Sequence, residues 1–132
     1  MCMLIIRKRL KRNLYLCVQQ DITHMAQSGL SEFNDSITVK PIYNVSEFLR
    51  SFHEESDALL FVDQYIGEES TIEKLTAIKK RLPGVKILLV ISDKTARMEI
   101  ALIIMSKIVS AILVRPFSIE QLTTNLNKLL GK

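Results

Sequence analysis

Five short apolar segments, each followed by polar residues, alternate along the chain with segments whose apolar residues recur at helical spacing. Continuous apolar runs of this length are typical of strands buried on both faces. We therefore expect strands at residues 14–18, 37–43, 58–62, 85–91 and 110–114. Pro41 lies inside the second run and cannot donate a ladder hydrogen bond, so this strand is predicted at or near a sheet edge. The run at 85–91 is the most apolar and is predicted to be central.

Between these strands, apolar residues recur every three or four positions, the spacing of one helix face. The predicted helices cover residues 22–33, 45–52, 72–82, 95–107 and 119–130. Asn44 and Ser118 stand where N-caps are expected. Pro83 ends the third helix, and Gly131 fits a C-terminal cap of the last.

Five strand–helix units in 132 residues predict one α/β domain, with a parallel sheet covered by helices on both faces. Short right-handed crossovers leave 2-1-3-4-5 as the simplest strand order, that of a flavodoxin-like three-layer sandwich. The carboxyl ends of parallel strands meet at one edge of the sheet. Polar residues that end the strands are therefore the candidate site residues.

The composition, 48% hydrophobic and 24% charged, is that of an ordinary globular domain. No strictly apolar run exceeds the six residues of the run at 100–105, which is far too short to cross a bilayer. The N-terminus is apolar first and basic afterwards, the reverse of a signal peptide. Cys2 and Cys17 do not suggest a disulfide framework. We therefore expect a cytoplasmic protein without a membrane partner.

The net charge of +4 is unevenly distributed, because five cations fall within residues 7–12 and the remainder carries about −1. We predict a basic N-terminal arm, residues 1–12, ahead of a nearly neutral domain, residues 13–132. Such an arm could contact nucleic acid or an acidic partner through counterion release. The simpler interpretation is a solvated extension. No aromatic residue lies among these cations, which disfavours stacking on single strands.

Polar residues with complementary chemistry follow four of the predicted strands. They are Gln19, Gln20 and Asp21 after the first, Asp63 after the third, Ser92 after the fourth, and Arg115 and Pro116 after the fifth. A carboxylate thus stands at the centre of the predicted pocket, with a cation beside it and two amides nearby.

From Leu14 to Leu130 the chain resembles the receiver domain of bacterial two-component response regulators. In that family an acidic pair after the first strand binds Mg²⁺ and an aspartate ending the third accepts phosphate. A Ser or Thr after the fourth strand and a Lys-Pro after the fifth contact the phosphoryl group. The resemblance implies that Asp63 is the phosphoacceptor equivalent and that Arg115-Pro116 matches the Lys-Pro pair. Ser92 matches the hydroxyl, unless Ile91 occupies that register.

Two departures from the family pattern suggest a degenerate receiver. Gln19 and Gln20 replace the acidic pair, and neutral amides are weak ligands for Mg²⁺, which prefers anionic oxygens. Phosphoryl transfer relies on that metal to neutralise developing charge. Arg115 replaces lysine, and the two are not equivalent at a tight site. Without a metal, Arg115 is expected to pair directly with Asp63.

The leading interpretation is therefore an interaction module of signal transduction or transcription regulation, not an enzyme, with no metal, cofactor or small-molecule substrate. The alternative is a working phosphoacceptor in which Asp21 turns inward and helps to bind Mg²⁺ beside Asp63. A flavodoxin-like cofactor binder is a third hypothesis. The lack of tryptophan and the scarcity of loop glycines argue against it.

The apolar run at 100–105 exceeds what one inward helix face can hide, because consecutive helix residues point about 100° apart. We expect self-association or partner binding through the fourth helix, the fifth strand and the fifth helix, a surface on which receiver domains commonly dimerise. The candidate contact residues are Ile100, Ile103, Ile104 and Leu129. The resemblance also allows a DNA-binding output domain beyond residue 132.

Overall fold

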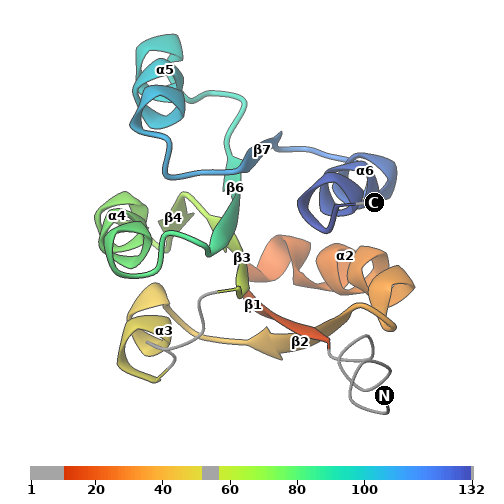
Figure 1. Ribbon diagram of the computed structural model, residues 1–132. Helices are drawn as coiled ribbons and strands as arrows, with labels where there is room; N and C mark the ends of the chain where they lie inside the picture. Colours follow the sequence, from red (N-terminus) through yellow and green to blue (C-terminus); the bar gives the residue numbers. More distant parts are fainter. Residues whose placement is uncertain (1–10, 52–56, 132) are drawn as a thin grey trace.

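In the computed structural model, which describes residues 11–51 and 57–131, five parallel strands form one sheet in the order β2-β1-β3-β6-β7 (Figure 1). The strands are β1 (Arg12–Cys17), β2 (Ile37–Pro41), β3 (Leu59–Asp63), β6 (Lys86–Ile91) and β7 (Ala111–Val114). This is the predicted 2-1-3-4-5 order, so the expected flavodoxin-like topology is confirmed. β6, which was predicted to be central, is an interior strand between β3 and β7, and the central strand of the five is β3.

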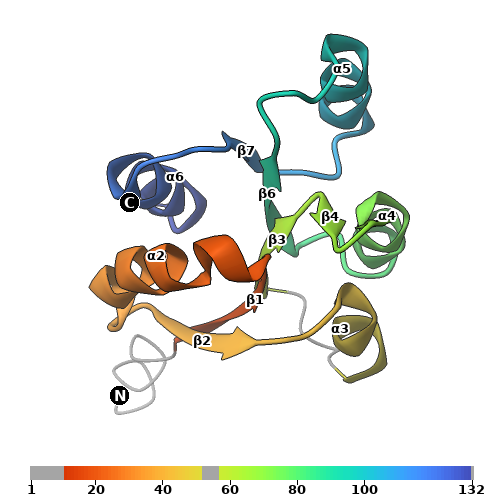
Figure 2. The same cartoon turned by 180° about the vertical axis from the view of Figure 1, so that it is seen from behind.

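Helices cover both faces of the sheet, as predicted (Figures 1 and 2). They are α2 (Gln20–Leu30), extended by the 3-10 turn η1 (Ser31–Phe33), α3 (Val45–Ser51), α4 (Ile72–Arg81), α5 (Arg97–Ser106) and α6 (Ile119–Leu129). α2 and α6 pack side by side on one face, and α3 and α4 on the other. Successive residues of a strand point to opposite faces. Phe61 therefore enters the core under α2 and α6, while Leu60 enters the second core.

Local signals in the sequence place the helix ends. The Asn44 side-chain oxygen accepts a hydrogen bond from the Glu47 N–H at 3.1 Å, which confirms the predicted N-cap of α3. Ser118 and Gln121 form a reciprocal capping box at the start of α6. Gly131 follows the helix with φ 78°, in the left-handed region that glycine adopts without strain.

Several boundaries differ from the prediction. β1 begins at Arg12, which pairs with Ile37, so this residue of the predicted basic arm belongs to the sheet; residues 1–10 and Phe52 lie outside the described residues. β2 is a sheet-edge strand, as Pro41 predicts, but it ends there and not at residue 43. α5 begins at Arg97, because residues 93–95 form turns before it.

A short antiparallel hairpin, β4 (Tyr65–Ile66) and β5 (Glu69–Ser70), lies between β3 and α4. The sequence predicts only a turn in this region. Gly67 supplies the tight bend, with φ 65°. The hairpin carries Tyr65 next to the carboxyl edge of the sheet, where the candidate site lies.

α5 stands apart from the other helices in both views (Figures 1 and 2). Met98, Leu102, Ile104 and Met105 are exposed on it, with Met105 at 74%, so the expected excess of apolar surface is present. Two of the candidate contact residues are nevertheless buried in the domain, Ile103 at 5% and Leu129 at 6% exposed. Ile103 packs in the core beneath α3 and α4, and Leu129 in the core beneath α2 and α6. Neither side chain can therefore contribute to a surface contact as predicted.

Within the described residues, no helix is both long enough and apolar enough to cross a lipid bilayer.

Candidate functional site

An ion pair between Asp63 and Arg115 forms the centre of the site. Asp63 is the last residue of β3, and its side chain is only 3% exposed. Arg115 follows β7 and donates hydrogen bonds from Nε and Nη2 to Oδ1, at 3.2 and 3.1 Å, and from Nη2 to Oδ2, at 2.9 Å. The Gln19 N–H donates to Oδ2 at 2.7 Å. The direct pairing expected from the sequence is confirmed, and both carboxylate oxygens are occupied.

The same guanidinium also holds a second carboxylate. Nη1 of Arg115 donates to Oδ2 of Asp21 at 2.7 Å, and Asp21 lies in the first turn of α2. Arg115 therefore spans a buried and an exposed carboxylate, since the Asp21 side chain is 64% exposed. A positive group of the protein occupies the position between the two acids.

The remaining predicted residues are only partly brought together. Ser92 and Gln19 line the same cavity as Asp63 and Arg115, with a volume of about 180 Å³. The Gln19 side chain turns away from the carboxylate and donates to the Tyr65 carbonyl at 3.0 Å. Gln20, which was expected in this pocket, lines a neighbouring groove of about 570 Å³. Its position in the first turn of α2 places it there.

Pro116 and Asp21 line a further cavity of about 430 Å³. Arg115 and Ser92 line both this cavity and the smaller pocket around Asp63. The peptide bond between Arg115 and Pro116 is cis.

Burial and pairing act in opposite directions on the ionisation of the site. Burial raises the pKa of Asp63 by more than the hydrogen bonds from Arg115 and the Gln19 N–H lower it, so the net direction is upward. The hydrogen bond from Arg115 lowers the pKa of Asp21. Burial lowers the pKa of Arg115, but its hydrogen bonds to the two carboxylates outweigh this, so Arg115 stays charged.

The donor set does not fit Mg²⁺, the metal that the family resemblance implies. Mg²⁺ requires several oxygen ligands in near-octahedral geometry. Here the oxygens of Asp63 accept from a guanidinium and a backbone N–H, and the Gln19 amide is turned toward Tyr65. Among the described residues, no group of three or more His, Cys, Asp and Glu side chains is placed to hold a metal.

Two buried polar residues next to the site were not predicted. Gln64 follows Asp63 and is 2% exposed; its Nε2 donates to Oε2 of Glu99 on α5 at 2.6 Å. The Thr71 hydroxyl, at the start of α4, contacts the Asp63 carbonyl at 2.7 Å. The site is thus connected to α4 and α5. The sequence did contain a signal for Gln64, because it is a polar residue that directly follows a buried strand.

Replacing Glu99 by alanine should destabilise the domain by about 1–3 kcal/mol, because the buried Gln64 amide loses its acceptor. Urea denaturation measures this, and amide hydrogen exchange should accelerate most in α5. The matched control is Glu73→Ala, which removes an exposed carboxylate from the first turn of α4. If both variants lose the same unfolding free energy, Glu99 stabilises the domain only through the dipole of its helix and not through Gln64.

Cys17 ends β1 and is a free, buried cysteine. Burial, with the nearby charge of Asp63 as the next contribution, raises the pKa of its thiol to about 11. The thiolate is the reactive form of cysteine, and a raised pKa keeps Cys17 in its thiol form at neutral pH.

No protein-family model matches the chain, and no curated protein is a significant match in sequence. Solved structures do match its fold. A response regulator from Thermotoga maritima is 21% identical with a TM-score of 0.73, over 93% of this chain and all of that one. A two-component response regulator from Clostridium difficile is 15% identical with a TM-score of 0.74, over 93% and 98%. A response regulator receiver domain protein from Clostridium thermocellum is 19% identical with a TM-score of 0.68, over 92% and 95%.

The chain therefore has the fold of response regulator receiver domains. At these identities the likeness establishes the fold alone.

Proposed function

We propose that this protein is an interaction module of signal transduction or transcription regulation that has the receiver fold but works without Mg²⁺-dependent phosphorylation. The observation that carries the proposal is the position of Arg115, which bonds to Asp63 and Asp21 at once. A fixed guanidinium supplies the positive charge that a metal ion would bring. Arg115 belongs to the segment between β7 and α6. Its charge therefore stays in the pocket, whereas a bound metal ion can dissociate. The receiver fold supports the assignment to signalling.

Beryllium fluoride, which mimics a phosphoryl group, tests the proposal directly. We expect no fluorine NMR signal from a bound adduct when the protein is titrated with the reagent in millimolar Mg²⁺, because both Asp63 oxygens are already paired. The control is Asp63→Asn, which removes the only carboxylate that could carry the adduct at this position.

A signal that requires Mg²⁺ and disappears in Asp63→Asn would overturn this proposal and support the phosphoacceptor alternative. A signal that persists in Asp63→Asn would arise elsewhere on the protein and would leave Asp63 unmodified, as proposed.

The exposed apolar surface of α5 supports the interaction role. Met98, Leu102 and Met105 lie at positions i, i+4 and i+7, so they form one stripe along the helix. Ile104 is also exposed but points about 100° away from Met105. Together with the partly exposed Ile100, these residues replace the buried Ile103 and Leu129 as the proposed contact surface. We assign it to a second copy of the chain or to a partner protein.

The same fold also occurs as part of longer chains. The similarity to NtrX from Brucella abortus, 16% identical with a TM-score of 0.72, covers 27% of that chain. A cytoplasmic module that acts together with an output domain is consistent with this arrangement.

A further inference from the structure

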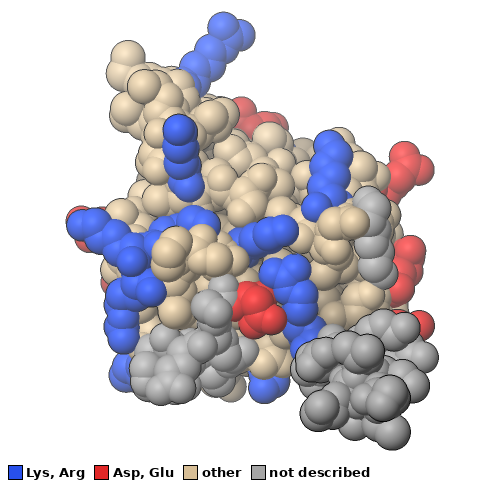
Figure 3. Space-filling model, in the orientation of Figure 1, with Lys and Arg blue, Asp and Glu red and all other residues tan. Residues whose placement is uncertain are grey.

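Cations from separate parts of the sequence gather on the edge of the sheet opposite the candidate site. Helices of a parallel α/β fold run opposite to the strands, so helix C-termini and strand starts share one edge. Figure 3 shows this edge, where blue side chains outnumber red ones. The cations there are Lys11 and Arg12 at β1, Lys79, Lys80 and Arg81 at the end of α4, Lys86 at β6, Lys107 after α5 and Lys128 at the end of α6.

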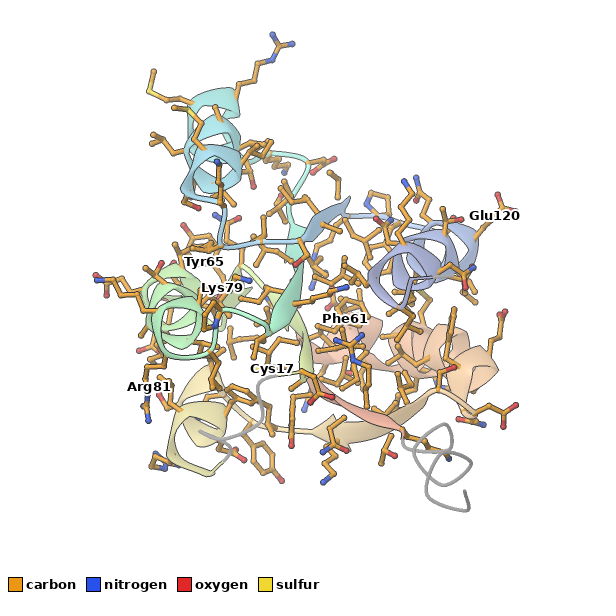
Figure 4. The ribbon with its side chains drawn as sticks, in the orientation of Figure 1. Cys17, Phe61, Tyr65, Lys79, Arg81 and Glu120 are labelled. Carbon is orange, nitrogen blue, oxygen red and sulfur yellow. The ribbon has the colours of Figure 1, made fainter. Side chains whose placement is uncertain are left out.

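Acidic residues are concentrated elsewhere. Those described at this edge are Glu32, Asp35 and Asp57, which lie near η1, β2 and β3. The part of this edge formed by α4, β6, α5 and α6 has no acidic side chain among its described residues. The acids of these helices lie in their first turns, at the opposite edge (Figure 4 labels Glu120 on α6, and Lys79 and Arg81 on α4).

Helix dipoles explain part of this separation, because cations stabilise helix C-termini and carboxylates stabilise N-termini. They do not explain Arg12 and Lys86, which begin strands. Lys79 and Lys86 are used structurally: their ammonium groups donate to the backbone carbonyls of Val85 and Leu129, each at 2.8 Å. Burial, and secondarily the charge of Lys86, lowers the pKa of Lys79, so like charges are crowded here. Lys80, Arg81, Lys107 and Lys128 are exposed and available to a partner.

We propose that this basic edge binds the phosphate backbone of double-stranded nucleic acid without reading its sequence. Adjacent strands lie about 4.8 Å apart, so β1 and β7 are separated by about 14 Å in the sheet, with a helix layer beyond each face. A duplex carries one charge per about 1.7 Å of its axis, so a surface of this width meets several phosphates. The basic residues Arg7, Lys8 and Arg9 also precede β1 in the sequence.

The surface lacks features that other ligands would use. None of the cavities described above is lined by these exposed cations, which therefore form an open surface among the described residues. The exposed tyrosines, Tyr43 and Tyr65, follow the carboxyl ends of β2 and β3, away from this edge, so single-stranded bases have no stacking platform among the described residues. The remaining feature of the basic edge is its positive charge, which favours the regularly spaced phosphates of a duplex backbone over these other ligands. This proposal does not depend on whether Asp63 is phosphorylated.

Fluorescence anisotropy with a labelled duplex of about 20 base pairs tests the proposal over a range of salt concentrations. The basic-edge variant is Lys80→Ala, Arg81→Ala and Lys128→Ala. The matched control is Lys40→Ala, Lys94→Ala and Arg97→Ala, three exposed cations at or near the opposite edge. Both variants remove three positive charges. A difference in their affinity therefore reports on where the cations lie and not on the total charge of the protein.

We expect wild type to bind with a dissociation constant of about 1–100 μM that weakens steeply with salt. The basic-edge variant should bind at least about tenfold more weakly, and its slope of log affinity against log salt should be shallower by about 2–3, because each lost phosphate contact removes about 0.9. The control should remain within about threefold of wild type. No binding by wild type, or equal weakening in both variants, would overturn the proposal. Stronger binding to anionic vesicles or to polyglutamate than to the duplex would also overturn it.

Discussion

Arg115→Met should destabilise the domain by about 3–5 kcal/mol at pH 7, because it leaves a buried carboxylate without its cation. In the wild type, Arg115 donates three of the four hydrogen bonds described on the Asp63 side chain, and the Gln19 N–H donates the fourth. Urea denaturation at pH 7 measures the loss. Methionine retains much of the length of the side chain, so the charge and its donors are the main groups removed.

The destabilisation should decrease as the pH falls. Without Arg115, burial dominates and the folded-state pKa of Asp63 rises further above its unfolded value. For such a raised pKa, the protonated carboxyl of Asp63 is compatible with burial, so the variant keeps its stability below the unfolded pKa of Asp63. It loses this stability as the pH rises through the folded-state pKa and the buried carboxyl ionises. The difference between Arg115→Met and wild type should therefore be smaller at pH 4.5 than at pH 7.

Two further variants isolate the buried pair. Asp21→Asn removes only the exposed partner of Arg115 and should cost under about 1 kcal/mol. The double variant Asp63→Leu, Arg115→Met removes both buried charges and should regain most of the lost stability. If Arg115→Met is no more harmful than Asp21→Asn, the buried pair does not stabilise this pocket.

Leu102→Glu combined with Met105→Glu should weaken self-association at least about 100-fold. Both side chains are exposed on the same stripe of α5, at 62% and 74%. Burying each in an interface contributes about 1.5–3 kcal/mol, and every 1.4 kcal/mol is a factor of ten in affinity. Sedimentation equilibrium measures the dissociation constant. Ile103→Glu, in contrast, would place a charge in the core and report on folding.

The matched control adds the same two charges to α2, as His24→Glu and Gln27→Glu, where both positions are exposed. It should associate as wild type does. A wild type that remains monomeric at high concentration would contradict self-association and leave α5 as a surface for a different protein.

Much of the fold follows from short-range signals. Pro41 could only lie where a ladder donor is dispensable, and β2 is indeed at an edge. Ser118 and Gln121 mark the start of α6 within four residues of sequence. The pairing of Asp63 with Arg115 was also predictable, because both residues end strands whose carboxyl ends share one edge.

Other features could not be predicted, because they depend on the angle at which an element packs. Residues 100–105 are all apolar, so their periodicity cannot show which side of α5 faces the sheet; the packing buries Ile103 and exposes Ile104. Gln20 and Asp21 are consecutive, and their directions depend on how α2 begins. Both residues line the neighbouring groove, but only Asp21 also reaches Arg115.

The sequence by itself determined the order of the strands, most helix ends and the residues that meet at the carboxyl edge, because these depend on periodicity, capping and strand direction. Only the tertiary structure decided that Arg115 spans two carboxylates, that Gln64 reaches Glu99 on α5, and that cations distant in sequence share one edge. The physical reason is that such contacts require a fixed orientation between elements. That orientation comes from packing both helix layers onto the twisted sheet, which local sequence patterns do not encode.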